Sequence, residues 1–139
     1  MNNITDIQTA LYNTLLTVPG LPVDIERENE RFKPDIRQDW VRVTLLPSET
    51  VKQSGGIGGY NTLQGVYQIS LFFPAGRKNI NDINILADAT IDAYVTALFL
   101  TENTTTVNVI DCWRDVGITE SDWFSMPVFV RWTSQQTRN

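Results

Sequence analysis

The side chains able to do chemistry in this sequence are mostly carboxylates, and their usual catalytic partners are missing. The chain of 139 residues has no histidine and a single cysteine, Cys112. Nucleophile systems that need histidine are therefore excluded, as are zinc sites built from histidine or from several thiolates. Cys112 lies in the strand-like run VNVIDCW, so we expect it to be a packed structural residue. These observations predict no enzyme, no catalytic residue, no metal ligand and no cofactor.

Two groups of carboxylates have a spacing that a hard cation can use. Asp24, Glu26 and Glu28 alternate along residues 23–28, and three such groups on one strand face can hold calcium or magnesium. Their alternation with Arg27 instead favours a solvated surface. The second group lies on an amphipathic segment and comprises Asp82, Asp88 and Asp92. That pattern is also typical of a solvated helix face, so a metal- or ligand-binding domain remains only an alternative.

The segment from Gln53 to Asn61 is the least regular part of the chain. It reads QSGGIGGYN and holds four of the eight glycines. A phosphate-binding loop would need further motif residues, such as the lysine of a P-loop, and a helix directly after it, and the sequence has neither. Because glycine leaves a chain with high conformational entropy, two interpretations stay open. The segment is a loop that orders against a partner, or it is an insertion that the fold tolerates.

Charge and composition favour a soluble globular domain. Hydrophobic residues make up 42% and charged residues 19%, and the formal net charge is −5. The basic residues are scattered, so we expect no specific nucleic-acid binding, which relies on a basic excess against phosphates. No apolar run approaches the ~18 residues of a membrane span, and no leader peptide is expected. The length predicts one domain over residues 1–139, with 133–139 as a frayed tail.

Apolar periodicity predicts two helices and five strands. The helices are expected at 3–17 and 80–99, and the strands at 23–28, 40–46, 63–73, 105–112 and 123–132. This pattern favours an α+β fold, a mainly antiparallel β-sheet of about five strands with two helices packed on one face, in the order α-β-β-β-α-β-β. The second and third strands should form a hairpin with an unusually long tip. Pro127 lies inside the last strand, which is therefore expected to be bulged or at a sheet edge.

Four tryptophans are many for a chain of this length. Trp132 fits a core position and Trp40 shares a strand face with Arg42, whereas Trp113 and Trp123 flank a turn. Exposed tryptophans would indicate a protein-binding surface, because this residue is enriched at interfaces. Alternatively, the rings cover the rim of the core.

Five blocks of sequence follow one another in the pattern of a known family. They are LLTVPGLPVDIERE (15–28), WVRVTLLPSET (40–50), LQGVYQISLFFPAGRK (63–78), ILADATIDAYV (85–95) and SDWFSMPVFVRW (121–132). In the order and spacing of these blocks the chain resembles the phage tail terminator family, the lambda-like tail terminators of long-tailed phages. Most matching positions are strand-core or turn residues, so the resemblance bears on the fold more directly than on the role.

The resemblance implies a structural virion protein that forms a six-membered ring on the last ring of the tail tube. The ring stops tube growth and offers a surface to head-completion proteins, so its partners are copies of itself, the tube protein and those proteins. No membrane is involved, and DNA passes through the lumen without specific binding. The expected location is the head-proximal end of the tail, after assembly in the host cytoplasm. A head-completion or connector protein of the head–tail interface is the alternative.

In that family the long loop between sheet strands lies at the assembly interface. The resemblance therefore assigns the corresponding loop of this chain to contacts with ring neighbours or with the tube. Its residues are Gln53, Ser54, Gly55, Gly56, Ile57, Gly58, Gly59, Tyr60 and Asn61.

Overall fold

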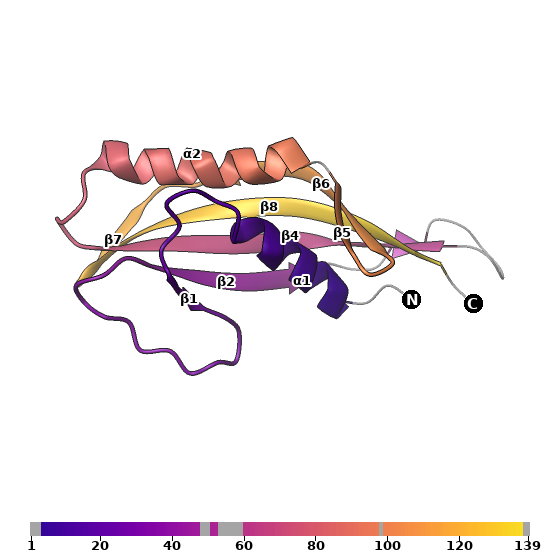
Figure 1. Cartoon of the computed structure of the whole chain (residues 1–139), viewed down its shortest axis with the longest axis horizontal. Coiled ribbons are helices and arrows are strands. Elements are labelled where there is room, and N and C mark those ends of the chain that lie inside the picture. The colour runs from indigo at the N-terminus through magenta and orange to yellow at the C-terminus, as the bar shows by residue number, and fades with distance from the viewer. Residues whose placement is uncertain (1–3, 48–50, 53–59, 98, 138–139) are drawn as a thin grey trace.

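The computed structural model describes residues 4–47, 51–52, 60–97 and 99–137, and within these ranges the chain forms two helices and eight strands (Figure 1). The helices are α1 (Ile4–Leu15) and α2 (Ile80–Ala97). The strands are β1 (Asp24–Glu26), β2 (Trp40–Pro47), β3 (Val51–Lys52), β4 (Tyr60–Pro74), β5 (Phe99–Glu102), β6 (Thr105–Arg114), β7 (Ile118–Glu120) and β8 (Trp123–Thr137). In the described ranges, neither helix is long and apolar enough to cross a membrane.

All eight strands belong to one sheet. Its main path runs β1-β2-β4-β8-β6-β5, while β3 pairs with β4 and β7 pairs with β8. The pairing is antiparallel throughout, except that β1 runs parallel to β2. β4 and β8 pair along their whole length of 15 residues, from Tyr60 opposite Thr137 to Pro74 opposite Trp123. These two strands form the spine of the fold.

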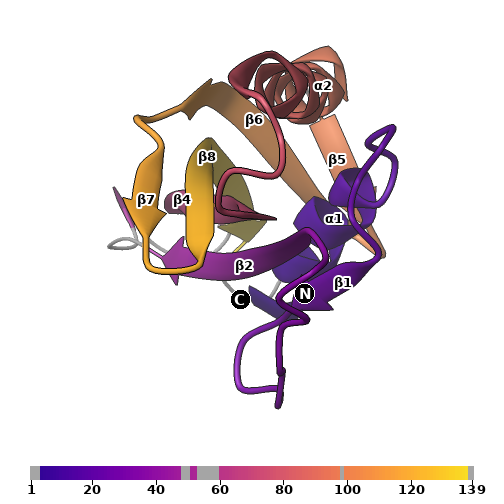
Figure 2. The same ribbon diagram turned by 90° about the vertical axis from the view of Figure 1, so that its left-hand side faces the viewer.

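One face of the sheet carries the hydrophobic core. Alternate residues of a strand point to the same side, and those of the central strands that face the helices are buried. They are Val41, Val43, Leu45, Tyr67, Ile69, Leu71, Phe73, Met126, Val128, Val130 and Trp132. The helices add residues at helical spacing, namely Ile7, Leu11 and Leu15 from α1 and Ile83, Leu86 and Tyr94 from α2. The sheet curls round this core so that β1 and β5 both lie beside α1 (Figure 2).

Hydrogen bonds between distant parts of the chain hold α1 in place. The hydroxyl of Tyr94 on α2 donates to the carbonyl oxygen of Leu11 at 2.6 Å, and burial raises the pKa of this tyrosine. At the other end of α1, the carboxylate of Asp6 accepts hydrogen bonds from Asn103 at 3.0 Å and from Thr105 at 3.1 Å. The helix is thereby tied both to α2 and to the β5–β6 hairpin.

The predicted fold class and element order are confirmed, and the differences lie in short strands and element ends. β3, β5 and β7 are additional strands, and Phe99 begins β5 instead of ending the second helix. The frayed-tail prediction is wrong for residues 133–137, which continue β8. Each of them has a partner between Tyr60 and Gln64 on β4, and the Ser134 hydroxyl donates to the carbonyl oxygen of Thr106 at 2.8 Å.

The expectation for Pro127 is also wrong, because β8 is a central strand and the register shift lies in β6 between Val109 and Asp111. The pairing of β6 with β8 ends where Arg114 lies opposite Val128, and the pairing of β7 with β8 begins where Ile118 lies opposite Ser125. The position beside Pro127 therefore falls in the connection 115–117. There, the carbonyl oxygen of Pro127 accepts a hydrogen bond from the N–H of Asp115 at 3.0 Å. The missing proline N–H costs no ladder hydrogen bond at such a gap.

Candidate assembly surfaces

The interface segment expected from the sequence starts and ends at one tip of the sheet (Figure 1). Gln53, Ser54, Gly55, Gly56, Ile57, Gly58 and Gly59 lie outside the described residues. Tyr60 and Asn61, which we expected in the loop, instead begin β4, where they pair with Thr137 and Gln136. Asn61 also pairs with Lys52 of β3. Both flanks of residues 53–59 are therefore strand residues at the end of the β4–β8 spine.

Aromatic rings gather around Trp40 on the sheet face away from the helices. The Trp40 ring stacks on Phe72, with centroids 4.0 Å apart and planes 6° apart. Trp123 meets the Trp40 ring edge-on at 5.7 Å, and Phe32 lies 5.0 Å from it. Trp40 is consequently only 3% exposed. Trp40 is therefore not an exposed tryptophan of a protein-binding surface. Its burial supports the other interpretation, in which the rings cover the rim of the core.

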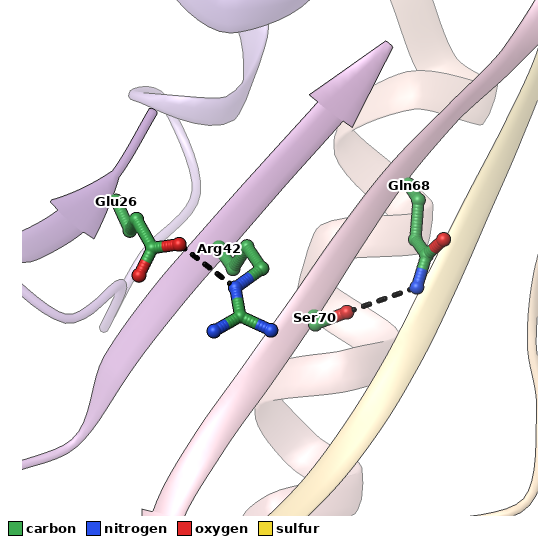
Figure 3. Close-up of polar contacts among 4 residues, drawn as sticks. All are labelled: Glu26, Arg42, Gln68 and Ser70. Atoms are coloured by element: carbon green, nitrogen blue, oxygen red, sulfur yellow. Dashed lines mark hydrogen bonds and ion pairs between the residues drawn. The ribbon is translucent and has the colours of Figure 1, made fainter. Parts of the chain in front are cut away.

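A pocket of about 420 Å³ opens beside this cluster, lined by Phe32, Pro34, Trp40, Arg42, Glu120 and Trp123 among others. The guanidinium of Arg42 lies 5.3 Å from the Trp40 ring centroid and 5.1 Å from that of Phe72. Its Nε donates to Oε1 of Glu26 at 3.0 Å (Figure 3). Arg42 is thus held by two aromatic faces and one carboxylate. Arginine and tryptophan are the residues that contribute most to binding energy at protein interfaces.

The carboxylates considered for metal binding do not converge on one point. Glu26 is paired with Arg42, and the Glu28 carboxylate accepts the main-chain N–H of Leu45 at the edge of β2. In the part of the chain that the structure describes, no three histidine, cysteine or acidic residues are grouped so as to hold a metal ion. The acidic residues of α2 are exposed, as the helix periodicity predicts; they are Asp82, Asp88 and Asp92.

Cys112 is a packed residue, as predicted, with only 8% of its surface exposed. Burial raises the pKa of its thiol to about 12. Nucleophilic cysteines need a lowered pKa, because the thiolate is the reactive form. Cys112 therefore contributes to packing between the sheet and α2 and has none of the properties of a reactive thiol.

A second aromatic pair lies further along the outer face of the sheet. The rings of Trp113 and Phe129 are 5.6 Å apart, and the guanidinium of Arg131 lies 5.1 Å from the Trp113 centroid. Between the two clusters, the Gln68 side chain donates to the Ser70 hydroxyl at 3.2 Å (Figure 3). The outer face is therefore polar and aromatic, with a guanidinium stacked at each of two places, while Trp132 is wholly buried in the core, as expected.

Phe32 and Pro34 are pocket residues that the sequence pattern did not reveal. They belong to the polar connection 27–39, which has no apolar periodicity. The available signal was the single aromatic residue in that connection, two positions before a proline. An aromatic side chain in an otherwise polar loop commonly anchors the loop by covering apolar surface, which Phe32 does against Trp40.

Comparisons with known proteins agree with this architecture. Several chains of solved structures match, and one of them aligns over 100% of both chains with a TM-score of 0.72 and 16% sequence identity. At that identity the likeness shows a shared fold. Curated protein sequences yield no match.

The family model described as phage tail terminator protein matches residues 6–132. The matched range begins in α1 and ends in β8, so it contains the sheet core, α2 and both aromatic clusters. The chain therefore belongs to the phage tail terminator family and is a structural component of the virion tail, not an enzyme.

Proposed function

We propose that this protein caps the tail tube as a ring of six copies, ends tube polymerisation and presents the surface to which the head joins. The observation that carries the proposal is the family match over residues 6–132 of the 139. The ring size and the head-joining role follow the family resemblance of the sequence blocks. On this proposal the ring lies at the head-proximal end of the tail, after assembly in the host cytoplasm.

The physical requirement for a cap is a subunit with two different binding sides. A tube that grows by stacking identical rings uses an open-ended, heterologous contact. A terminator has to match the exposed end of that tube and present another surface above it. The two unlike faces of this molecule, a helical face and a polar–aromatic sheet face, support such a role.

Residues 53–61 are proposed to contact ring neighbours or the tail tube. The support is their position in the chain, because Lys52 and Tyr60, the strand residues on either side of 53–59, lie at one tip of the sheet. Contacts made at a tip can reach a neighbouring subunit without disturbing the core. Four glycines in this stretch allow it to adapt to a partner surface.

The acidic balance of the chain fits a ring through which DNA passes. The formal net charge is −5, and binding to duplex DNA depends on neutralising phosphates with basic side chains. A lumen that released DNA slowly would hinder ejection, so a low affinity for nucleic acid is favourable here.

Electron microscopy of particles made without this protein tests the cap. Overlong tails are expected, because tube growth would have no stop. Tailless heads beside tails of normal length would instead identify a head-completion or connector protein. Light scattering of the pure protein, alone and with tail tubes, then gives its molar mass, and a mass that stays at one subunit in both samples contradicts the ring.

Deletion of residues 54–59 tests whether this segment contacts ring neighbours or the tail tube. We expect the variant to keep the wild-type circular dichroism spectrum and thermal midpoint, because the buried core and the described strands contain none of the deleted residues. Ring formation or tube binding should be lost. A variant of equal length with the order of residues 54–59 shuffled separates the role of loop length from that of the side chains. Normal capping of tubes by the deletion variant would refute the assignment.

A further inference from the structure

α2 carries an exposed face with an isoleucine at its centre and carboxylates around it. Ile85 is 67% exposed. Asp82 lies three residues before Ile85, Asp88 lies three residues after it, and Asp92 follows Asp88 by four residues, which places these carboxylates on the same side of the helix as Ile85. All three are exposed. The sequence of α2 contains no lysine or arginine. The face is therefore acidic and partly apolar, and no basic side chain of its own helix neutralises it.

Residues 27–38, between β1 and β2, show the opposite charge pattern. This segment, named here the basic segment, holds four of the eleven basic residues, namely Arg27, Arg31, Lys33 and Arg37. It also holds three carboxylates, but Glu28 is bonded to the N–H of Leu45 and Asp35 is bonded to Arg37. Glu28 and Glu30 are exposed and Asp35 is half-buried, so Glu30 is the one carboxylate of this segment that is exposed and has no such bond among the described residues. Arg31 and Lys33 are exposed, and Ile36 is 68% exposed.

The two surfaces lie on opposite sides of the molecule. α2 is at the top and the basic segment is at the bottom in both views (Figures 1 and 2). The basic segment is anchored from within, because Phe32 packs against Trp40 and Arg27 lies 4.2 Å from the Tyr12 ring centroid. Arg31 and Lys33 on either side of Phe32 are thus presented on a fixed base.

The spacing of the charged groups also matches. Pro34 restricts Lys33 to an extended backbone, and two residues of extended chain span about 6–7 Å. Asp88 and Asp92 are four residues apart on a helix, which separates their β carbons by about 5–6 Å. Two carboxylates can therefore meet two basic side chains without rearrangement of either element.

We propose that α2 of one copy docks on the basic segment of the next copy, with Asp88 and Asp92 facing Arg31 and Lys33 and with Ile85 near Ile36. The contact joins two different surfaces on opposite sides of the subunit, which makes it heterologous. A heterologous contact repeats from copy to copy and closes into a ring when the rotation allows it. The inference rests on the proposed ring and names the contact that builds it.

Charge reversal in two separate variants tests this contact. One variant carries Asp88→Lys and Asp92→Lys, and the other carries Arg31→Glu and Lys33→Glu. Each alone brings like charges together, so ring formation should weaken by about tenfold or more. In a ring in which the two variants alternate, contacts between a reversed helix and a reversed segment alternate with contacts between two unreversed surfaces, so every contact joins opposite charges. Mixing should therefore restore assembly, measured as molar mass by light scattering or as capped tubes by electron microscopy.

A matched control and the wild type separate the possible failures. Asp122→Lys replaces an acidic residue by a basic one, as the α2 variant does, but at the exposed β7–β8 turn. This turn belongs to neither proposed surface, so the variant should assemble normally. If the wild type forms rings and both reversed variants do so unimpaired, this contact is refuted while the ring stands. The same holds if both variants fail and their mixture fails as well. If the wild type forms no ring, alone or on tubes, the proposed function itself is refuted.

Discussion

Two tyrosines of the core form a natural pair for testing which hydroxyl stabilises the fold. Tyr67 and Tyr94 are both fully buried. The Tyr94 hydroxyl donates to the carbonyl oxygen of Leu11 at 2.6 Å, whereas the Tyr67 hydroxyl has no hydrogen-bond partner in the described structure. The substitutions Tyr94→Phe and Tyr67→Phe each remove one oxygen and leave the ring in place, so they differ mainly in the bond that is lost.

The expected effects have opposite directions. A buried hydrogen bond contributes about 1 kcal/mol net, so Tyr94→Phe should lower the free energy of unfolding by roughly 1–2 kcal/mol. Burial of a hydroxyl without a partner costs about 1–3 kcal/mol, so Tyr67→Phe should be neutral or stabilising by about 1 kcal/mol. Together these values separate the two variants by about 2 kcal/mol, which corresponds to roughly 5–8 °C in the thermal midpoint of a domain of this size.

Urea unfolding at neutral pH, followed by tryptophan fluorescence, measures both changes against the wild type. Equal slopes of the free energy against urea concentration show that the comparison concerns stability alone. If Tyr67→Phe proves as destabilising as Tyr94→Phe, the Tyr67 hydroxyl has a bonding partner of its own. The opposite directions expected for the two variants would then be refuted.

Three further changes probe packing, titration and the sheet edge. Gly117→Ala places a β carbon against the Phe124 ring, so we expect a loss of about 1–3 kcal/mol that the double variant with Phe124→Leu partly recovers in thermal unfolding. Burial raises the pKa of Cys112 to about 12 from the usual value of 9.0; the folded state therefore holds this proton more tightly, and stability should be full below about pH 9 and fall as pH rises toward 12. In denaturant titrations at several pH values, Cys112→Ala should make the free energy of unfolding fall less steeply just above pH 9. Glu28→Ala removes the acceptor of the Leu45 N–H and should cost about 1 kcal/mol, whereas Glu30→Ala in the same segment should leave urea unfolding unchanged.

Strong periodicity is what made the main elements predictable. Along β4, the residues Tyr67, Ile69, Leu71 and Phe73 alternate with polar ones, and the burial follows the same alternation. The short strands lack this signal, because β5 and β7 have only four and three residues. They become strands because β6 and β8 offer free main-chain groups beside them. Residues 133–137 are wholly polar and also lack the signal; they continue β8 because each pairs with a residue at the start of β4.

The pocket on the outer face was less predictable, because its parts come from distant segments. Trp40 and Phe72 are brought together by strand register, and Phe32 joins them from a connection without periodic pattern. A face-sharing argument gave Trp40 and Arg42 correctly as neighbours but could not show that three other rings bury the indole. The charge match between α2 and residues 27–38 is likewise a property of the folded chain.

Side chains satisfy main-chain N–H groups at two positions where one side of β2 and of β6 has no neighbouring strand among the described residues, which bears on how copies can join. On β2, Trp40 to Arg42 pair with β1, and the N–H of Leu45 is bonded by the Glu28 carboxylate. Alternate strand residues direct their N–H groups to the same edge, so the next such position is Pro47, which has no N–H. On β6, the N–H of Cys112 is bonded by the Asp111 carboxylate at 2.8 Å. Strand addition at these positions would have to displace a charged side chain or meet a proline, and both are recognised barriers to uncontrolled sheet extension. A protein that ends polymerisation benefits from such edges, since copies then join through side-chain surfaces of defined charge rather than through unlimited pairing of strands.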